Sequence, residues 1–289
     1  MEAQSDHDIY SYERFTRHDF YTAVNRALVA EVVRRLPTGP ADRGRTIVDL
    51  GCGTGAITEM LVEALGQHGL EAAIIGVEPS SSALAEAERR LAGSGADIRF
   101  VQGDGADLAG LGTTVDAVLF CNAIHLVDDP DCTVREVADV LSPGGLFAFN
   151  SAFSSDAYVP GTESFYRHWT VRAMRWLRSE HPEVRISRGG AAVTRRWRSR
   201  EEYEAVLREH GFDLLHGALD EVQMTLASFQ DIGHYWLFIE GALPGAPLGL
   251  GAEALRRGAA EAFDELGLTS VPRNWLQVLA RRGPISAAS

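Results

Sequence analysis

The chain has 289 residues, and all 27 of its basic Lys and Arg residues are arginines. The absence of lysine excludes chemistries that depend on that side chain, such as Schiff-base catalysis with pyridoxal phosphate and phosphate binding by a P-loop lysine. The formal net charge of −13 disfavours nucleic acid as a partner, because like charges repel.

The rest of the composition is typical of a globular protein, with 45% hydrophobic and 23% charged residues. The three cysteines are an odd number without C-x-x-C spacing, so neither a disulfide framework nor a metal site is indicated. Residues 1–8 contain no apolar segment of a signal peptide, and no run of 18 apolar residues occurs. We therefore expect a cytoplasmic protein with no membrane partner; the sequence does not indicate an oligomeric state.

Up to residue 150 the sequence predicts one helix followed by alternating strands and helices. The first helix lies within residues 10–36, which begin with aromatics, and the prolines of 37–40 end it. Five apolar segments predict strands at 46–50, 72–77, 98–101, 115–121 and 146–150. Three helices separate them, at 56 to about 65, from the serines after Pro79 to about 91, and at about 131–141. This alternation is typical of a parallel sheet with helices on both faces.

After residue 150 the pattern changes to longer helices and fewer strands. Helices are predicted at 161–180, from the capping box Ser199–Glu202 to Gly211, at about 228–242 and at about 252–266. Strands are predicted at 212–225 and 275–280. Six arginines lie at positions 185, 188, 195, 196, 198 and 200. They form either an acid-paired surface or a site for a carboxylate, a phosphate or an acidic carrier protein.

The strongest motif is a glycine-rich turn between a predicted strand and helix, Val48-Asp-Leu-Gly-Cys-Gly-Thr-Gly55. Glycines let the backbone approach a ligand closely, and the helix N-terminus presents unpaired N–H groups. Glu78, at the end of the next strand, can accept hydrogen bonds from both hydroxyls of a ribose. Gly51-x-Gly53-x-x-Ala56 also fits the dinucleotide fingerprint, so the turn alone is compatible with a nicotinamide-dependent oxidoreductase.

Five motifs in order over about residues 45–150 resemble those of the class I S-adenosylmethionine-dependent methyltransferases. They are Asp49–Gly55, Glu78, Gln102–Ala106, Asp116–His125 and Leu141–Gly145. The resemblance implies that S-adenosylmethionine is the cofactor, that Asp49 orients its ammonium group and that Asp104 receives its adenine amino group. The cofactor-binding residues that it implies are Asp49, Gly51, Cys52, Gly53, Gly55, Glu78, Pro79, Asp104, Gly105, Ala106, Asn122 and Ala123, together with Tyr12 and Tyr21 as a cover.

The same resemblance implies an α/β fold, a Rossmann-like, doubly wound, seven-stranded and mostly parallel sheet with helical cap insertions. We expect residues 1–40 to form an N-terminal helical cover, 41–152 the cofactor-binding core and 153–198 a helical cap insertion. Residues 199–289 would complete the core and contain a second helical insertion over about 226–270.

His125 is the candidate catalytic residue. Methyl transfer is an in-line displacement, and an oxygen or carbon acceptor usually has to lose a proton near neutral pH. His125 follows the fourth predicted strand, at the edge where open α/β sheets bind ligands, although a histidine there can also simply pack. Some amino-group methyltransferases carry [DN]-P-P-[YF] where this chain has Asn122-Ala-Ile-His125, which favours O- or C-methylation over N-methylation.

Two aromatic helical stripes, one with Trp169 and one with Phe229, favour an apolar or aromatic small-molecule acceptor that can carry an anionic group. Core packing explains the same stripes, and it also explains Tyr12 and Tyr21. We expect a specialised metabolite or lipid-like acceptor.

Three other functions compete with a small-molecule methyltransferase. A non-methylating protein that binds the same cofactor, as a scaffold or as a catalyst of cyclisation or rearrangement, would share every binding motif. An oxidoreductase fits less well, since it has no use for Gly103-Asp104 or for the turn Leu141–Gly145. A nucleic-acid methyltransferase is disfavoured by the net charge and by the segment Asn122–His125.

Overall fold

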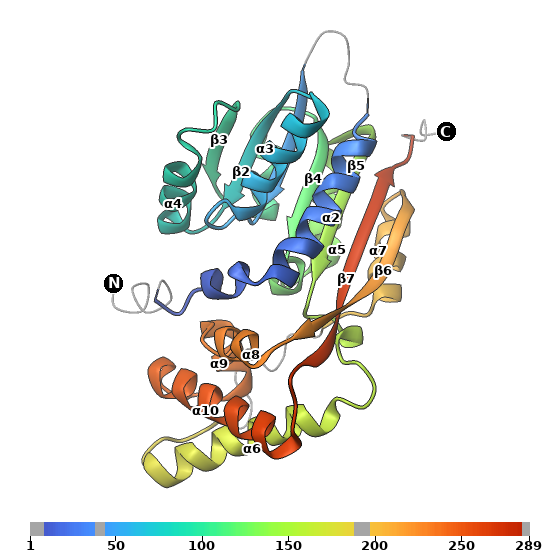
Figure 1. Ribbon diagram of the computed structural model, residues 1–289. Coiled ribbons are helices and arrows are strands. Elements are labelled where there is room, and N and C mark those ends of the chain that lie inside the picture. The colour runs from blue at the N-terminus through green and yellow to red at the C-terminus, as the bar shows by residue number, and fades with distance from the viewer. Residues whose placement is uncertain (1–8, 38–43, 188–196, 285–289) are drawn as a thin grey trace. The chain divides into compact units, whose positions relative to one another are not determined.

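The computed structural model describes residues 9–37, 44–187 and 197–284, which belong to two compact units (Figure 1). The sheet unit comprises the described residues of Ala23–Asp156, Trp197–Asp220 and Trp275–Ser289. The helical unit comprises those of Met1–Thr22, Ala157–Arg196 and Glu221–Asn274. The division expected at residues 40, 152 and 198 stays a prediction.

A seven-stranded sheet has the order β3-β2-β1-β4-β5-β7-β6. The strands are β1 (Arg45–Leu50), β2 (Ala72–Glu78), β3 (Ile98–Gln102), β4 (Val115–Cys121), β5 (Leu141–Ser151), β6 (Phe212–Met224) and β7 (Val271–Arg282). The first five pair in parallel, and β7 runs antiparallel to β5. The predicted α/β fold with a mostly parallel seven-stranded sheet is therefore confirmed.

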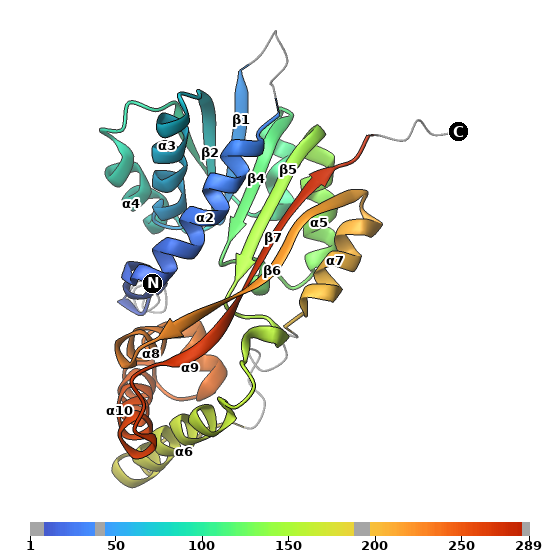
Figure 2. The ribbon, with the colours of Figure 1, turned by 45° about the vertical axis from the view of Figure 1, so that its right-hand side comes forward.

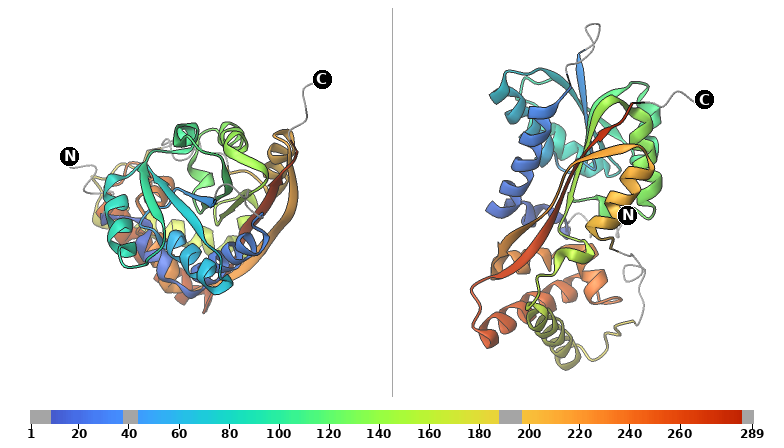
Figure 3. Two further views of the ribbon diagram at one scale, coloured as in Figure 1. Left: turned by 90° about the horizontal axis from the view of Figure 1, so that it is seen from above. Right: turned by 90° about the vertical axis from the view of Figure 1, so that its right-hand side faces the viewer.

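Helices cover both faces of the sheet, as the apolar strands predicted (Figures 2 and 3). On one face α2 (Asp19–Arg35) and α3 (Ala56–His68) pack against alternate strand residues such as Ile47 and Leu119. On the other face α5 (Pro130–Val140) and α7 (Arg200–Glu209) pack against Val48 and Phe120. Because β1 to β5 are parallel, their carboxyl ends meet at one edge, and α4 (Ser81–Leu91) returns the chain from that edge to β3.

The helical unit has its own aromatic core. Its helices are α6 (Glu163–Glu180), α8 (Leu226–Ile232), α9 (Trp236–Ala242) and α10 (Leu248–Leu266), preceded by the 3₁₀ helix η1 (Tyr12–Arg17). Phe165, Trp169, Phe229 and Phe263 pack ring against ring, and the indole N–H of Trp169 donates to the Leu255 carbonyl at 2.8 Å. Trp169 and Phe229, which the aromatic stripes singled out, are thus core residues of this unit.

The single helix predicted at 228–242 is wrong, because the chain forms α8 and α9 with a break at 233–235. The backbone N–H of Trp236 donates to the carbonyl of Tyr10 at 2.8 Å rather than to the preceding turn. Gly233 lies against α10, where a Cβ atom would come within 3.1 Å of the Leu255 Cβ. Contacts with segments distant in sequence therefore override the continuous apolar pattern.

No helix within the three described ranges is long and apolar enough to cross a bilayer.

Close packing of α6 and α10 gives a stability prediction. A Cβ at Gly258 would lie 2.7 Å from the backbone nitrogen of Ala173 and from the carbonyl oxygen of Trp169. Gly258→Ala should therefore force the helices apart and lower the free energy of unfolding by about 1–3 kcal/mol, measured by urea denaturation. Gly241→Ala in α9 is the matched control, since a Cβ there meets no atom within 4 Å. An equally stable Gly258→Ala protein would contradict the packing.

Candidate active site

The glycine turn after β1 is held against β2 by its backbone. The N–H groups of Gly51 and Cys52 both donate to the Val77 carbonyl, at 2.7 and 3.1 Å. Gly51, Gly53 and Gly55 have φ of +67°, +52° and +85°, the left-handed region that favours glycine. A Cβ at Gly53 would meet no atom within 4 Å, so the backbone there faces open space. This geometry fits a ligand that lies directly against the chain.

Glu78 ties the glycine turn to the end of β2. Its Oε2 accepts from the Gly53 N–H at 3.1 Å, and its Oε1 accepts from the Ser80 N–H at 3.0 Å. Burial raises the pKa of Glu78, while these two hydrogen bonds lower it by smaller amounts. Each carboxylate oxygen still has a lone pair for a further donor, as ribose binding requires.

Asp49 is a carboxylate buried under the turn, with 1% of its surface exposed. Thr58 in α3 donates its hydroxyl to Oδ2 at 2.6 Å, whereas Oδ1 is buried and has no hydrogen-bond donor among the described residues. Burial raises the pKa of Asp49 to about 7, the Thr58 hydrogen bond opposes this, and the charge of Glu78 adds to the rise. A cationic donor group at Oδ1 would satisfy the orphaned atom and favour its ionised form.

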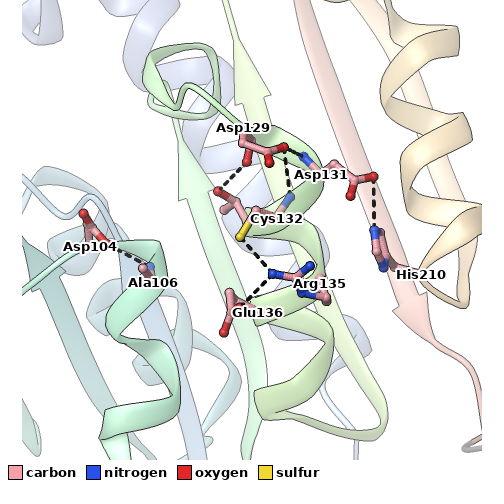
Figure 4. A network of polar contacts seen from close by, with 9 residues as sticks. Asp104, Ala106, Asp129, Asp131, Cys132, Arg135, Glu136 and His210 are labelled. Atoms are coloured by element: carbon pink, nitrogen blue, oxygen red, sulfur yellow. Dashed lines mark hydrogen bonds and ion pairs between the residues drawn. The ribbon is translucent and has the colours of Figure 1, made fainter.

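The segment after β3 forms a short capped turn (Figure 4). Asp104 caps the 3₁₀ helix η2 (Gly105–Leu111): its Oδ1 accepts from the Ala106 N–H at 2.8 Å, and its own N–H donates to Asp107 at 2.9 Å. Asp104 and Ala106 are exposed, and the Gly103 N–H donates to the Glu78 carbonyl at 3.2 Å. The turn therefore joins the ends of β2 and β3.

Asn122, directly after β4, has a φ of +57°, a conformation that no other non-glycine residue of the described chain adopts. Its N–H donates to the carbonyl and to the side-chain oxygen of Asn150, both at 3.0 Å, and its amide donates to Asn25 at 3.1 Å. Asn150 also donates to Asn25, at 2.8 Å. This amide network orients Ala123, whose Cβ would lie 3.2 Å from a Cβ on Gly51.

His125 is half-buried in the 3₁₀ helix η3 (Ile124–Leu126). Its Nδ1 lies 2.9 Å from the hydroxyl of the buried Ser151, which also accepts from the Phe153 N–H at 2.9 Å. The imidazole packs on the Phe153 ring, with centroids 4.5 Å apart, and Trp197 meets the same ring edge-on at 5.5 Å. The contact at Nδ1 and the ring packing therefore hold the histidine beside an aromatic wall.

The predicted residues at the ends of β1 to β4 thus come together. Cys52 points its thiol toward the core, where a Cβ on Gly76 would lie 3.0 Å from it, so Cys52 offers its backbone to the turn. The Pro79 carbonyl accepts from the Gln102 amide at 3.0 Å. Four further residues of the site, Asn25, Asn150, Ser151 and Thr58, belong to none of the predicted site residues. Of these four, only Asn150 and Ser151 had a signal in the sequence, which is their position at the end of a predicted strand.

Two further predictions concern residues outside this set. Tyr12 and Tyr21 belong to the helical unit, where their rings are 6.0 Å apart, and their role as a cofactor cover stays a prediction. Of the arginine cluster, positions 188, 195 and 196 lie outside the described residues. Arg185 is exposed, and Arg200 forms an ion pair with Glu201 at 2.9 Å, which agrees with the acid-paired surface interpretation.

No group of three or more His, Cys, Asp or Glu side chains that could hold a metal ion occurs in the described part of the chain.

Comparison with known proteins identifies the family. A family described as a methyltransferase domain matches residues 47–145. Demethylmenaquinone methyltransferase of Corynebacterium urealyticum is 30% identical over 183 residues, which cover 62% of this chain and 71% of that protein. The chain belongs to the class I S-adenosylmethionine-dependent methyltransferases. It is therefore an enzyme of a family that uses S-adenosylmethionine as its cofactor.

Two further proteins are similar to this methyltransferase, over different shares of its length. Trans-aconitate 2-methyltransferase of Methylobacterium nodulans is 33% identical over 184 residues, 63% of this chain and 62% of that enzyme. The crystal structure titled as a putative sarcosine dimethylglycine methyltransferase from Galdieria sulphuraria matches with a TM-score of 0.55 at 16% identity. That match covers 91% of this chain and 86% of the other, and it shows the fold alone.

The buried carboxylate of the methyltransferase gives a prediction for stability against pH. The folded pKa of Asp49, about 7, lies above the ordinary value of 3.8, so ionisation costs the folded state stability as pH rises from about 4 to 7. Asp49→Asn keeps an acceptor for Thr58 and removes the charge. It should raise the free energy of unfolding at pH 8 by up to about 4 kcal/mol in the ligand-free protein, and by little at pH 4.

Asp116→Asn is the matched control for that measurement. Asp116 is also 1% exposed, but its two oxygens accept from the Thr46 N–H at 2.9 Å and the Ser142 hydroxyl at 3.2 Å. An amide there would face a donor, so this variant should be less stable than the parent protein. A pH-independent stability difference between Asp49→Asn and the parent would contradict the raised pKa.

Proposed function

We propose that this methyltransferase moves a methyl group from S-adenosylmethionine to an oxygen or carbon atom of a small-molecule acceptor, with His125 as general base. The observation that carries the proposal is the histidine itself. Its Nδ1 contacts the hydroxyl of Ser151. It lies three residues after Asn122, at the edge of the sheet where the glycine turn also lies.

Three carboxylates of the chain are candidate partners for the ammonium group, the ribose and the adenine of the cofactor. We propose that Asp49 receives the ammonium group at its orphaned Oδ1, that Glu78 receives the ribose hydroxyls, and that Asp104 receives the adenine amino group. The backbone of Gly51, Cys52, Gly53 and Gly55, and of Pro79, Gly105, Ala106, Asn122 and Ala123, would line the remaining surface. When bound, S-adenosylmethionine supplies a methyl group on a positively charged sulfur.

Ser151 would set the protonation of His125 as well as its position. The serine oxygen already accepts from the Phe153 N–H and has a second lone pair. If it accepts from Nδ1–H of His125, Nε2 is the basic nitrogen of the ring, the atom that can take a proton from the acceptor. Ser151 is then a positioning residue, and Phe153 keeps the imidazole in one plane through ring packing.

A small-molecule acceptor is supported by the names of the relatives, which act on demethylmenaquinone and trans-aconitate. The segment Asn122-Ala-Ile-His125 favours an oxygen or carbon atom over nitrogen, and the ring wall of Phe153 and Trp197 favours an apolar or aromatic acceptor such as a specialised metabolite or lipid-like compound.

The assay that tests the proposal uses methyl-labelled S-adenosylmethionine and a metabolite extract, with the labelled product identified by mass. A labelled small molecule that depends on the protein supports it. Tight cofactor binding without label transfer would instead favour the non-methylating cofactor-binding protein.

His125→Gln should lower kcat for the identified acceptor by about 10²–10⁴-fold at neutral pH, because general bases contribute about that much. The loss should shrink at high pH if the acceptor ionises by itself. Ser151→Ala should lower kcat about tenfold with little change in KM and shift the acid limb of the pH profile. Turnover of His125→Gln close to the parent protein at saturating cofactor across the pH range would refute the role.

Cofactor affinity should depend on pH through Asp49. Below its pKa of about 7, a proton has to leave the carboxyl before an ammonium group can bind, so affinity should fall about tenfold per pH unit. Calorimetric titration with S-adenosylhomocysteine between pH 5.5 and 8 measures this. In Asp49→Asn the affinity should be lower and the slope should vanish.

Thr58→Val tests the pH dependence of cofactor affinity in a second way. The Thr58 hydroxyl donates to Asp49 and lowers its pKa, so removing it should move the acid limb to higher pH. If the affinity of Thr58→Val falls over the same pH range as that of the parent protein, a group other than Asp49 titrates.

A further inference from the structure

Asn25 is a polar residue of α2 that is completely buried, with 0% of its surface exposed. Its side-chain oxygen accepts from the side-chain amides of Asn122 and Asn150, at 3.1 and 2.8 Å. All three residues belong to the sheet unit. Burial of an amide costs free energy that its hydrogen bonds only offset, whereas Leu28 and Val29, one turn further along α2, gain stability by apolar packing. The three asparagines, which we call the amide clamp, therefore indicate a role other than packing.

One side of the amide clamp continues into the turn that contains His125. Asn122 begins this turn, and the Leu126 N–H donates to the Ala123 carbonyl at 2.8 Å. Ala123 also lies against the glycine turn, because a Cβ on Gly51 would come within 3.2 Å of its Cβ. A displacement of Asn122 would therefore move both the histidine and the residue that packs on the glycine turn.

The other side of the amide clamp continues into the residue that contacts the imidazole. Asn150 directly precedes Ser151, whose hydroxyl lies 2.9 Å from Nδ1 of His125. Asn150 also accepts from the Asn122 N–H at 3.0 Å, so the end of β5 contacts the end of β4 directly as well. The side-chain oxygen of Asn25 thus joins the two chain segments that hold His125, the turn after β4 and the end of β5.

A further hydrogen bond holds α2 in place directly beside Asn25. Gln277 of β7 is 2% exposed and donates its amide to the Val24 carbonyl at 2.9 Å. Gln277 is also the neighbour of Asn150 across the antiparallel pair of β5 and β7. Apolar packing such as that of Val32 has no preferred direction, whereas hydrogen bonds fix both a distance and an angle. The amides therefore position this turn of α2 more exactly than its apolar contacts do.

We propose that Asn25 is a positioning residue for methyl transfer, which fixes His125 relative to Ser151 and to the glycine turn through the amide clamp. The inference rests on the proposed function, in which His125 is the general base. A general base has to lie within hydrogen-bond reach of the proton that it takes, and a misplacement of about 1 Å lowers the rate even when the base itself is retained. Asn25 provides the shared acceptor that prevents this misplacement.

The kinetics of Asn25→Leu test the proposal. Leucine fills a similar volume without an acceptor, so kcat for the identified acceptor molecule should fall about 10- to 100-fold, as expected for a misplaced base. KM for this molecule should change less than about threefold, because the ring wall of Phe153 and Trp197 is not part of the amide clamp. Asn25→Asp keeps a side-chain oxygen in the same place and should recover most of the lost kcat.

A double variant tests whether Asn25 acts through Asn150. Asn150→Leu removes the same hydrogen bond from the donor side. The kcat of Asn25→Leu/Asn150→Leu should therefore be about that of the slower single variant, because both substitutions break one interaction. Multiplication of the two losses would show independent effects and would contradict the proposal.

Nitrogen NMR of the His125 ring tests the geometry without an acceptor molecule. The chemical shifts of the ring nitrogens depend on which nitrogen carries the proton and on the hydrogen bonds that each makes. In Asn25→Leu they should move toward the shifts of Ser151→Ala, in which the contact at Nδ1 is removed. The ring signals are assigned by their loss in His125→Gln. Ring shifts or a kcat equal to those of the parent protein, in folded Asn25→Leu, would overturn the proposal.

Val32→Ala is the matched control, because it weakens α2 without changing the amide clamp. Val32 is 0% exposed and packs against the sheet, so its truncation should lower stability and leave kcat and the ring shifts of His125 as they are. A loss of kcat in Val32→Ala as large as that in Asn25→Leu would attribute the effect to destabilisation and overturn the proposal.

Two further outcomes keep the test decisive. If Asn25→Leu does not fold, Asn25→Ala, which also lacks the acceptor and leaves room for water, is measured in the same way. A parent protein that methylates no acceptor would contradict the proposed function, and the ring shifts would still show whether Asn25 positions His125. Normal methyl transfer by folded Asn25→Leu would instead contradict the role of Asn25 alone.

Discussion

Burial of the Asp49 carboxylate at the end of β1 is the constraint on which the proposed cofactor site depends. One oxygen is satisfied by Thr58 and the other is not, so the folded protein keeps an acidic group at a pKa of about 7 instead of 3.8. A cationic ligand offsets this cost, and a neutral one cannot. If Asp49 receives the ammonium group of the cofactor, as we propose, the preference for that group is built into the ligand-free fold, at the expense of its stability.

Much of the fold could be predicted, and so could the proximity of the proposed cofactor-binding residues, because their signals are local in sequence. The turn Asp49–Gly55 and the acid Glu78 each follow an apolar strand, and parallel strands end at one edge. The break at 233–235 could not be predicted, since it depends on Tyr10, more than 200 residues away. The same holds for Asn25, which meets Asn150 only in the folded chain.

In this chain without lysine, the structure shows which arginines are exposed and which one is buried. Most described arginines are exposed or half-exposed, several of them paired with acids, as at Arg256 and Glu253. The sequence offers an anion site as one interpretation of the segment 185–200, where arginines are dense. Density in sequence does not report burial, and the arginine that the fold removes from water is Arg273, an isolated residue of β7. Its tyrosine neighbours come from segments that no local pattern connects.

The shared acceptor Asn25 has a practical consequence. Its side-chain oxygen accepts from the side-chain amides of Asn122 and Asn150, so one residue of α2 holds both the loop that follows β4 and the end of β5. A shortened chain that starts at β1 would keep every residue of the family signature at 47–145 and yet leave two amide groups without their acceptor. Recombinant truncations or domain fusions designed from the signature alone would therefore distort Asn122, whose backbone already has an unfavourable φ of +57°.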